Sequence, residues 1–182
     1  MNLGRNKKYV SPAKAIALVG ISAATLECSK LALSFLPNVE VVTLLTALYG
    51  YVFGWLGVCS AVVFVCIEPL IYGINSWVIT YFIYWPLVAL VFMLLRRARV
   101  RNRWILTAAA VGLTVFFGIL SSIIDSAIML GINEYYFKNL IIFYLRGAVF
   151  YIVQIACNAT IFPLLFLYFA DKLRLIRRNM RI

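Results

Sequence analysis

The chain contains no histidine, which removes the residue most often used for proton transfer and for metal binding near neutral pH. Acidic residues are also scarce, with 6 Asp and Glu against 17 Lys and Arg among 182 residues. The four cysteines lie in apolar stretches without a CxxC spacing, so we expect small buried side chains, with no zinc site and no disulfide framework. The GxxxxGK[ST] loop, the HExxH motif and the nucleophile elbow are missing as well. These absences predict a protein that is not itself an enzyme and has no metal or cofactor of its own.

Hydrophobic residues, in contrast, make up 65% of the chain, whereas a soluble domain has about 45–50%. The mean hydropathy is +0.99. One spanning helix needs about 20 apolar residues, so a chain of this length has room for six spans joined by short connections. The sequence therefore predicts an all-α integral membrane protein with six transmembrane helices in a single domain, residues 1–182. The expected helices cover residues 12–35, 39–54, 55–72, 76–95, 104–130 and 140–170.

The net charge of +11 is concentrated in three clusters of basic residues. These are Arg5, Lys7, Lys8 and Lys14; Arg96, Arg97, Arg99, Arg101 and Arg103; and Lys172, Arg174, Arg177, Arg178 and Arg181. An even number of spans places all three clusters on the same side of the membrane. Because cytoplasmic loops carry an excess of Lys and Arg, we expect both termini to be cytoplasmic in a multi-pass protein of a bacterial cell membrane. Anionic lipid headgroups are a second use for this charge, and nucleic acid is not an expected partner.

A short polar interruption separates the first two apolar stretches. Pro37 cannot donate a backbone hydrogen bond and disfavours helix at Leu36, so the first helix should end before it. Asn38 is a good N-cap for the next helix, and Glu40 places a negative charge near the positive end of that helix. The segment predicts a sharp helix–loop–helix corner.

In this topology every ionisable residue within or beside the spans falls in the outer half of the bundle. A charge at depth costs about 2.5–3.5 kcal/mol, so the collection needs an explanation. One interpretation is ion pairing, of Glu27 with Lys30 and of Arg146 with Asp125 or Glu68. The other is a polar and aromatic cavity that is open to the outside and binds a sizeable organic solute. For this cavity we expect substrate contacts from Asn38, Glu40, Glu68, Trp77, Tyr81, Tyr84, Asp125, Arg146, Tyr151 and Asn158, with Tyr144 and Gln154 at nearby levels.

Small residues form a strip on the first helix. Ala13, Ala17, Gly20 and Ala24 are spaced by four and three, which lets another helix approach closely in lipid. From the spacing alone, that neighbour can equally be a helix of this chain or of a partner.

Four segments resemble a known family. Residues 36–45 read LPNVEVVTLL and are similar to the LPNVE-x-VTLL signature of a group of substrate-binding S components of energy-coupling factor (ECF) vitamin transporters. Residues 68–73, EPLIYG, resemble the E-x-L-I-Y-G element of that group, and residues 84–87, YWPL, match its Y-x-W-P-L region in part. Asn158 followed by Phe162-Pro163-Leu164 resembles a GN…KPL pattern, with Cys157 and Phe162 in place of the glycine and the lysine.

The resemblance implies a membrane subunit that captures a vitamin at the outer face. Such a subunit docks on a transmembrane coupling subunit of the EcfT type, which two ATPase subunits of the EcfA type drive. In that family an Ala-x-x-x-Ala strip on helix 1 makes the docking contact, and Ala13 and Ala17 match it, with Gly20 and Ala24 extending the strip. The signature favours cobalamin (vitamin B12) as the transported ligand; riboflavin, hydroxymethylpyrimidine, folate and a queuosine precursor are alternatives. A scaffold of the MreD type is the rival from another class.

Overall fold

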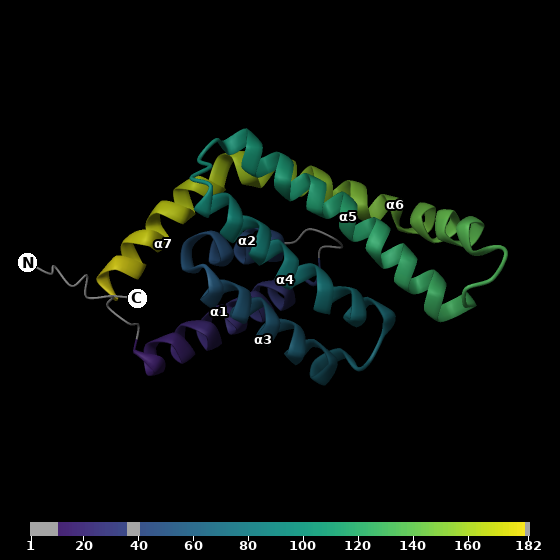
Figure 1. Cartoon of the computed structure of the whole chain (residues 1–182), viewed down its shortest axis with the longest axis horizontal. Helices are drawn as coiled ribbons and strands as arrows, with labels where there is room; N and C mark the ends of the chain where they lie inside the picture. The colour runs from purple at the N-terminus through teal and green to yellow at the C-terminus, as the bar shows by residue number, and fades with distance from the viewer. Residues whose placement is uncertain (1–10, 36–40, 181–182) are drawn as a thin grey trace, which may run out of the picture.

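The structure, a computed structural model, describes residues 11–35 and 41–180, and this part of the chain is helical without strands (Figure 1). The elements are α1 (Pro12–Ala32), α2 (Val42–Phe53), α3 (Trp55–Tyr72), α4 (Ser76–Arg97), α5 (Arg103–Leu130), α6 (Tyr136–Ile161), the π-helical segment η1 (Phe162–Phe166) and α7 (Leu167–Asn179). The predicted corner at Pro37, Asn38 and Glu40 lies outside the described residues.

Five helices are long and apolar enough to cross a membrane: α1, α3, α4, α5 and the run of 44 residues from α6 through α7. Large apolar side chains such as Ile16, Ile79, Phe137 and Leu145 point outward from these helices. In water such a surface would be unfavourable, whereas in a bilayer it faces hydrocarbon of matching polarity. The structure therefore indicates an all-α, membrane-embedded protein.

The second predicted span is short in the structure. Helix α2 has 12 residues and rises about 18 Å, compared with about 30 Å for the hydrocarbon core. Nearly all of its side chains are buried, because α2 is packed among α1, α3, α4 and α7. Residues 39 and 40, which belong to the predicted helix 39–54, lie outside the described part of the chain. A sixth membrane span therefore stays a prediction.

Glycines allow α2 to pack closely against its neighbours. Gly54 has a φ of +66° and forms the sharp turn from α2 into α3. A Cβ atom on Gly50 would overlap the backbone of Ala89 in α4, and one on Gly57 would overlap the backbone of Tyr49 in α2. These contacts make α2 the centre of a compact group with α3 and α4.

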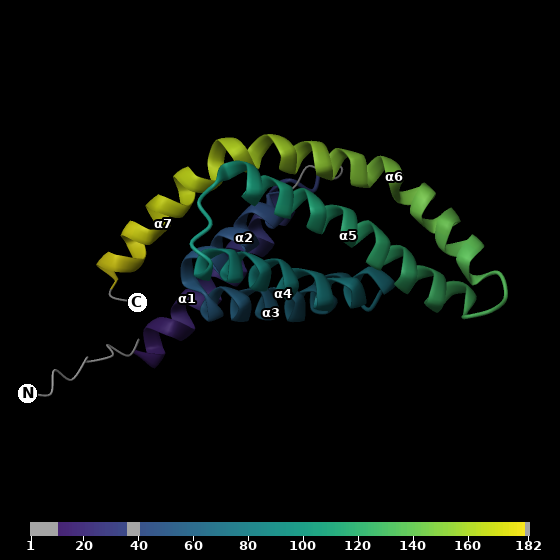
Figure 2. The same ribbon diagram turned by 45° about the horizontal axis from the view of Figure 1, so that its top comes forward.

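Helices α5 and α6 form a long hairpin that extends beyond the other helices at its joined end (Figure 2). The predicted last helix, 140–170, begins earlier in the structure, at Tyr136. The reason is a tight turn in which Asn133 donates to the carbonyl of Leu130 and accepts from the backbone N–H of Tyr135. This run also continues past residue 170 to Asn179, and it is interrupted only by the π-helical segment containing Pro163. A proline inside a helix removes a backbone donor, which accounts for the irregular turn.

Polar contacts tie α7 to the rest of the bundle. Asp171 of α7 pairs with Arg101 at 3.0 Å and with Arg174 at 2.9 Å, and Arg177 donates to Val52 O of α2. The guanidinium groups of Arg96 and Arg174 lie over the Tyr51 ring, at 5.6 and 5.1 Å from its centroid. Directly after α7, Met180 O accepts a hydrogen bond from Lys14 Nζ at 2.8 Å. Members of all three basic clusters thus lie at one end of the molecule, which we call the basic end. Which side of the membrane it faces stays a prediction.

The cysteines differ from the expectation of buried side chains. Cys28, Cys59 and Cys66 are exposed, and Cys157 is partly buried. The outward faces of membrane helices are as apolar as their packed faces, so an apolar neighbourhood in the sequence does not distinguish protein contact from lipid contact.

Candidate functional site

A cavity of about 510 Å³ lies between α4 and the α5–α6 hairpin, in the half of the bundle away from the basic end. We call it the aromatic cavity. Its walls are formed by Trp77, Tyr81, Phe117, Ser121, Asp125, Phe143, Arg146, Gly147, Phe150, Tyr151 and Gln154. The structure thus brings together five predicted contact residues, Trp77, Tyr81, Asp125, Arg146 and Tyr151, from three helices.

Aromatic rings in edge-to-face and tilted contact with one another form one wall of this cavity. Trp77 and Tyr81 are 5.1 Å apart between ring centroids, and Tyr81 lies 6.1 Å from Phe117. Phe117 in turn lies 6.3 Å from Tyr151 in an edge-to-face contact. Separations of 4.5–7 Å are favourable for aromatic pairs, so the rings hold one another in place. The result is a preformed apolar surface on which a flat solute can stack.

Two opposite charges line the cavity without pairing with each other. Asp125 Oδ2 accepts a hydrogen bond from Ser121 Oγ at 3.2 Å, whereas Asp125 Oδ1 is buried without a partner among the described residues. Arg146 is exposed, with its guanidinium 5.8 Å from the centroid of the Phe143 ring, and it forms no ion pair within the described part of the chain. The predicted pairing of Arg146 with Asp125 or Glu68 is therefore wrong. The cavity is thus lined by one carboxylate and one guanidinium group that form no ion pair within the described part of the chain.

Lys30 lies behind the aromatic wall. Its ammonium group is 2.5 Å from Glu68 Oε2 and sits over the rings of Tyr72, Trp77 and Tyr81, at 4.1, 4.9 and 5.2 Å from their centroids. A cation over aromatic faces is attracted by their electron-rich surfaces, so Lys30 fixes two of the rings that line the cavity.

This arrangement corrects two predictions. Lys30 pairs with Glu68 of α3, not with Glu27 one turn away on its own helix. Glu68 is fully buried and does not line the aromatic cavity, so its role is to hold Lys30 in position. Both carboxylate oxygens of Glu27 are buried without a hydrogen-bond donor among the described residues.

The position of Tyr151 depends on two glycines. A Cβ atom on Gly118 of α5 would come within 2.9 Å of Tyr151 Cδ2. A Cβ atom on Gly147 of α6 would overlap the Tyr151 hydroxyl group. The phenol ring therefore occupies space that only glycine leaves open, between the two helices of the hairpin.

The remaining predicted contact residues do not line the cavity. Tyr84 is buried one turn deeper, where its ring packs 4.8 Å from that of Phe117. Asn158 is also buried, and its side-chain amide donates to Thr114 Oγ1 at 2.9 Å. Asn38 and Glu40 lie outside the described residues.

Sequence reasoning missed Phe117, Ser121, Phe143, Gly147 and Phe150, which also line the cavity. Their spacing in the sequence, relative to the residues that were predicted, could have identified them. Residues 117 and 121 precede Asp125 by eight and four positions, and the missed residues of α6 fall three or four positions from Arg146 or Tyr151. Residues with that spacing share one face of a helix.

The small-residue strip on α1 is open. Ala13, Ala17, Gly20 and Ala24 are all exposed, and a Cβ atom on Gly20 would meet nothing within 4 Å. No helix of the described chain covers this strip.

Three comparisons with known proteins gave no match, whether to a family model, to a curated protein or to a solved structure. The structure itself defines an all-α, membrane-embedded protein with one polar and aromatic cavity between α4, α5 and α6.

Proposed function

We propose that this protein is the substrate-binding S component of an ECF-type transporter, which captures a vitamin or a vitamin precursor for ATP-driven uptake. The observation that carries the proposal is the aromatic cavity, which gathers five residues chosen from sequence and leaves Asp125 and Arg146 unpaired. Unpaired charges within a membrane protein are costly and mark a solute pathway more often than packing. The LPNVE segment gives independent support from sequence.

The lining of the cavity indicates the chemistry of the solute. An aromatic ring can pack against Trp77 and Tyr81, a hydrogen-bond donor can bind the Asp125 carboxylate, and an anionic or carbonyl group can bind Arg146. A volume of about 510 Å³ lies within the range of 300–1,000 Å³ typical of small-molecule sites. Among the candidate vitamins, riboflavin, hydroxymethylpyrimidine, folate and a queuosine precursor are small enough for this volume. The much larger corrin of cobalamin would need the α5–α6 hairpin to move away from α4.

The energy for uptake would come from partner subunits. We infer that the exposed strip of Ala13, Ala17, Gly20 and Ala24 docks on a coupling subunit of the EcfT type, driven by two ATPases of the EcfA type. Small side chains allow the close helix contact that replaces the hydrophobic effect in lipid.

Titration of the purified protein with riboflavin, hydroxymethylpyrimidine, folate, queuine and cobalamin tests the proposal. We expect one compound to bind, and Arg146→Gln to weaken its binding about 10- to 150-fold, because a hydrogen bond to a charged group is worth about 1.5–3 kcal/mol. Lys138→Gln is the matched control, since Lys138 is an exposed cation of α6 that does not line the cavity. Failure of all five compounds to bind would contradict the transporter proposal, and equal effects of the two variants would mean that the site lies elsewhere.

The docking surface needs a separate experiment. Ala13→Trp and Ala17→Trp should each abolish uptake by whole cells while leaving ligand binding by the purified protein intact. Val62→Trp adds the same bulk at an exposed position of α3 and should leave both unchanged. Normal uptake by the alanine variants would refute the docking role.

A further inference from the structure

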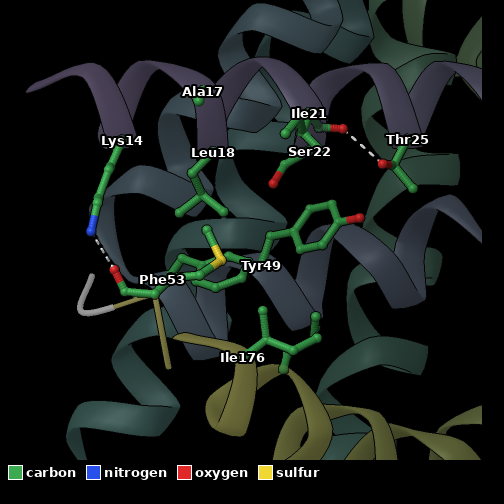
Figure 3. Close-up of a pocket in the computed structure, with 11 residues that line it drawn as sticks. Lys14, Ala17, Leu18, Ile21, Ser22, Thr25, Tyr49, Phe53 and Ile176 are labelled. Atoms are coloured by element: carbon green, nitrogen blue, oxygen red, sulfur yellow. Dashed lines mark hydrogen bonds between the residues drawn. The ribbon is translucent and has the colours of Figure 1, made fainter. Parts of the chain in front are cut away.

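A second hollow, which we call the α1–α7 groove, lies at the basic end. It has a volume of about 450 Å³ and is lined by side chains of α1, α2 and α7 and by Met180 (Figure 3). Leu18, Phe53 and Ile176 give it an apolar wall, and Lys14 crosses its mouth to donate a hydrogen bond to Met180 O at 2.8 Å. The Thr25 hydroxyl donates to Ile21 O within α1, so it presents no unpaired donor to the groove.

The groove has the length of one half of a bilayer. Its lining on α1 runs from Lys14 to Thr25, a rise of about 16 Å along the helix. Half of a hydrocarbon core is about 15 Å thick. Lys14 stands at the basic end of the groove, Ala17, Leu18 and Ile21 follow it along α1, and Ser22, Thr25 and Tyr49 add hydroxyl groups at the far end.

The charge at this end favours an anion. Besides Lys14, the described chain places Arg96, Arg101, Arg174 and Arg177 here, and the acid facing them, Asp171, already pairs with two arginines. An ammonium group has three N–H donors, and Lys14 uses one of them for Met180 O. Basic pockets between membrane helices are typical binding sites for anionic lipid headgroups.

The volume distinguishes an acyl chain from a helix. A partner helix about 10 Å across would occupy roughly 1,250 Å³ over the same 16 Å, which exceeds the space between α1 and α7. An acyl chain about 4 Å across, the contact distance between carbon atoms, needs roughly 200 Å³ over that length. The Lys14 side chain also crosses the mouth, where it would obstruct a helix but can bind a phosphate.

We propose that the α1–α7 groove holds one acyl chain of an anionic phospholipid, with the phosphate of that lipid bound by Lys14. The bound lipid fills the space between α1 and α7 and joins these two helices. This site is separate from the aromatic cavity and does not depend on what the cavity binds.

Native mass spectrometry of the full-length protein, released from detergent containing equal amounts of phosphatidylglycerol and phosphatidylcholine, tests the proposal. We expect one retained phosphatidylglycerol molecule per chain. Ile176→Glu places a carboxylate in the groove and should abolish retention. Leu175→Glu is the matched control, since Leu175 is 50% exposed and Ile176 48% exposed, and only Ile176 lines the groove. Lys14→Gln should lower retention about fivefold and Lys14→Arg should preserve it.

Several results would overturn this assignment. Equal retention of the two lipids would show that no anionic group is recognised, and equal loss in the two glutamate variants would show that the chain does not lie in the groove. If lipid is retained only after deletion of residues 1–10, that segment is the native occupant. If glycerol phosphate without acyl chains displaces the lipid fully, only the phosphate is bound. Gel filtration of each variant verifies that it is folded and monodisperse.

Discussion

Replacing Lys30 with methionine tests how the aromatic wall is held. The change removes the ammonium group but keeps a long apolar side chain. In the structure Glu68 is 0% exposed and Lys30 is 22% exposed, so the carboxylate has no access to water once its partner is gone. Glu27, another buried carboxylate, lies beside it. We therefore expect Lys30→Met to be strongly destabilising.

The magnitude follows from the burial of the pair. Removing one partner of a buried ion pair costs about 3–5 kcal/mol. For a chain of 150–250 residues this lowers the unfolding temperature by about 6–20 °C. Glu68→Gln should cost less, about 1–3 kcal/mol, because the amide still offers an acceptor and Lys30 keeps three rings and some contact with water.

Thermal unfolding in detergent, followed by circular dichroism, gives the comparison. The double variant Lys30→Met/Glu68→Gln should be more stable than Lys30→Met alone, because no uncompensated partner of the pair remains. Lys138→Met, at an exposed position that forms no ion pair with the described residues, should change the unfolding temperature by less than about 2 °C. Additive effects of the two single changes, or a larger effect of Glu68→Gln than of Lys30→Met, would refute the reasoning.

Two further changes test the packing around the cavity. Gly147→Ala should lower the unfolding temperature by about 2–12 °C, because the added methyl group would overlap the Tyr151 hydroxyl group. Gly112→Ala should not lower it, because a Cβ atom at Gly112 meets nothing within 4 Å. Equal unfolding temperatures of the two variants would argue against this packing. Thr114→Val removes the acceptor of the Asn158 amide and should cost about 1–3 kcal/mol, and Thr114→Ser should restore the loss. A wild-type melting curve for Thr114→Val would show that the amide finds another partner.

The positions of three helices were predictable because glycine, asparagine or arginine residues bound each of their apolar runs, whereas the predicted helices 12–35, 39–54 and 140–170 each differ from the structure by three or more residues at one end. The predicted helix 55–72 coincides with α3, and 76–95 and 104–130 differ from α4 and α5 by one or two residues at one end. Five of the ten predicted contact residues meet in one cavity because depth in the membrane is set by position along each helix. Residues at the same depth on adjacent helices are therefore close together in space.

Pairings across the bundle could not be predicted in the same way. Lys30 and Glu68 are 38 positions apart, and the spacing of three favoured Glu27 as the partner of Lys30. The face of a helix that turns inward depends on neighbouring helices, which a single sequence does not specify. For this reason Tyr84 and Asn158, predicted to contact the substrate, lie in the packed interior instead. The length of α2 was missed for a related reason: a helix enclosed by protein is as apolar as one that spans lipid.

The most direct test of the central claim, that the aromatic cavity binds a small solute, is mass spectrometry of the ligand released when the gently purified protein is denatured. The account predicts one aromatic compound carrying an anionic or carbonyl group, present in stoichiometric amount with the wild-type chain and strongly depleted with Arg146→Gln. The same compound retained in equal amount by both proteins, or no compound from either, would contradict it.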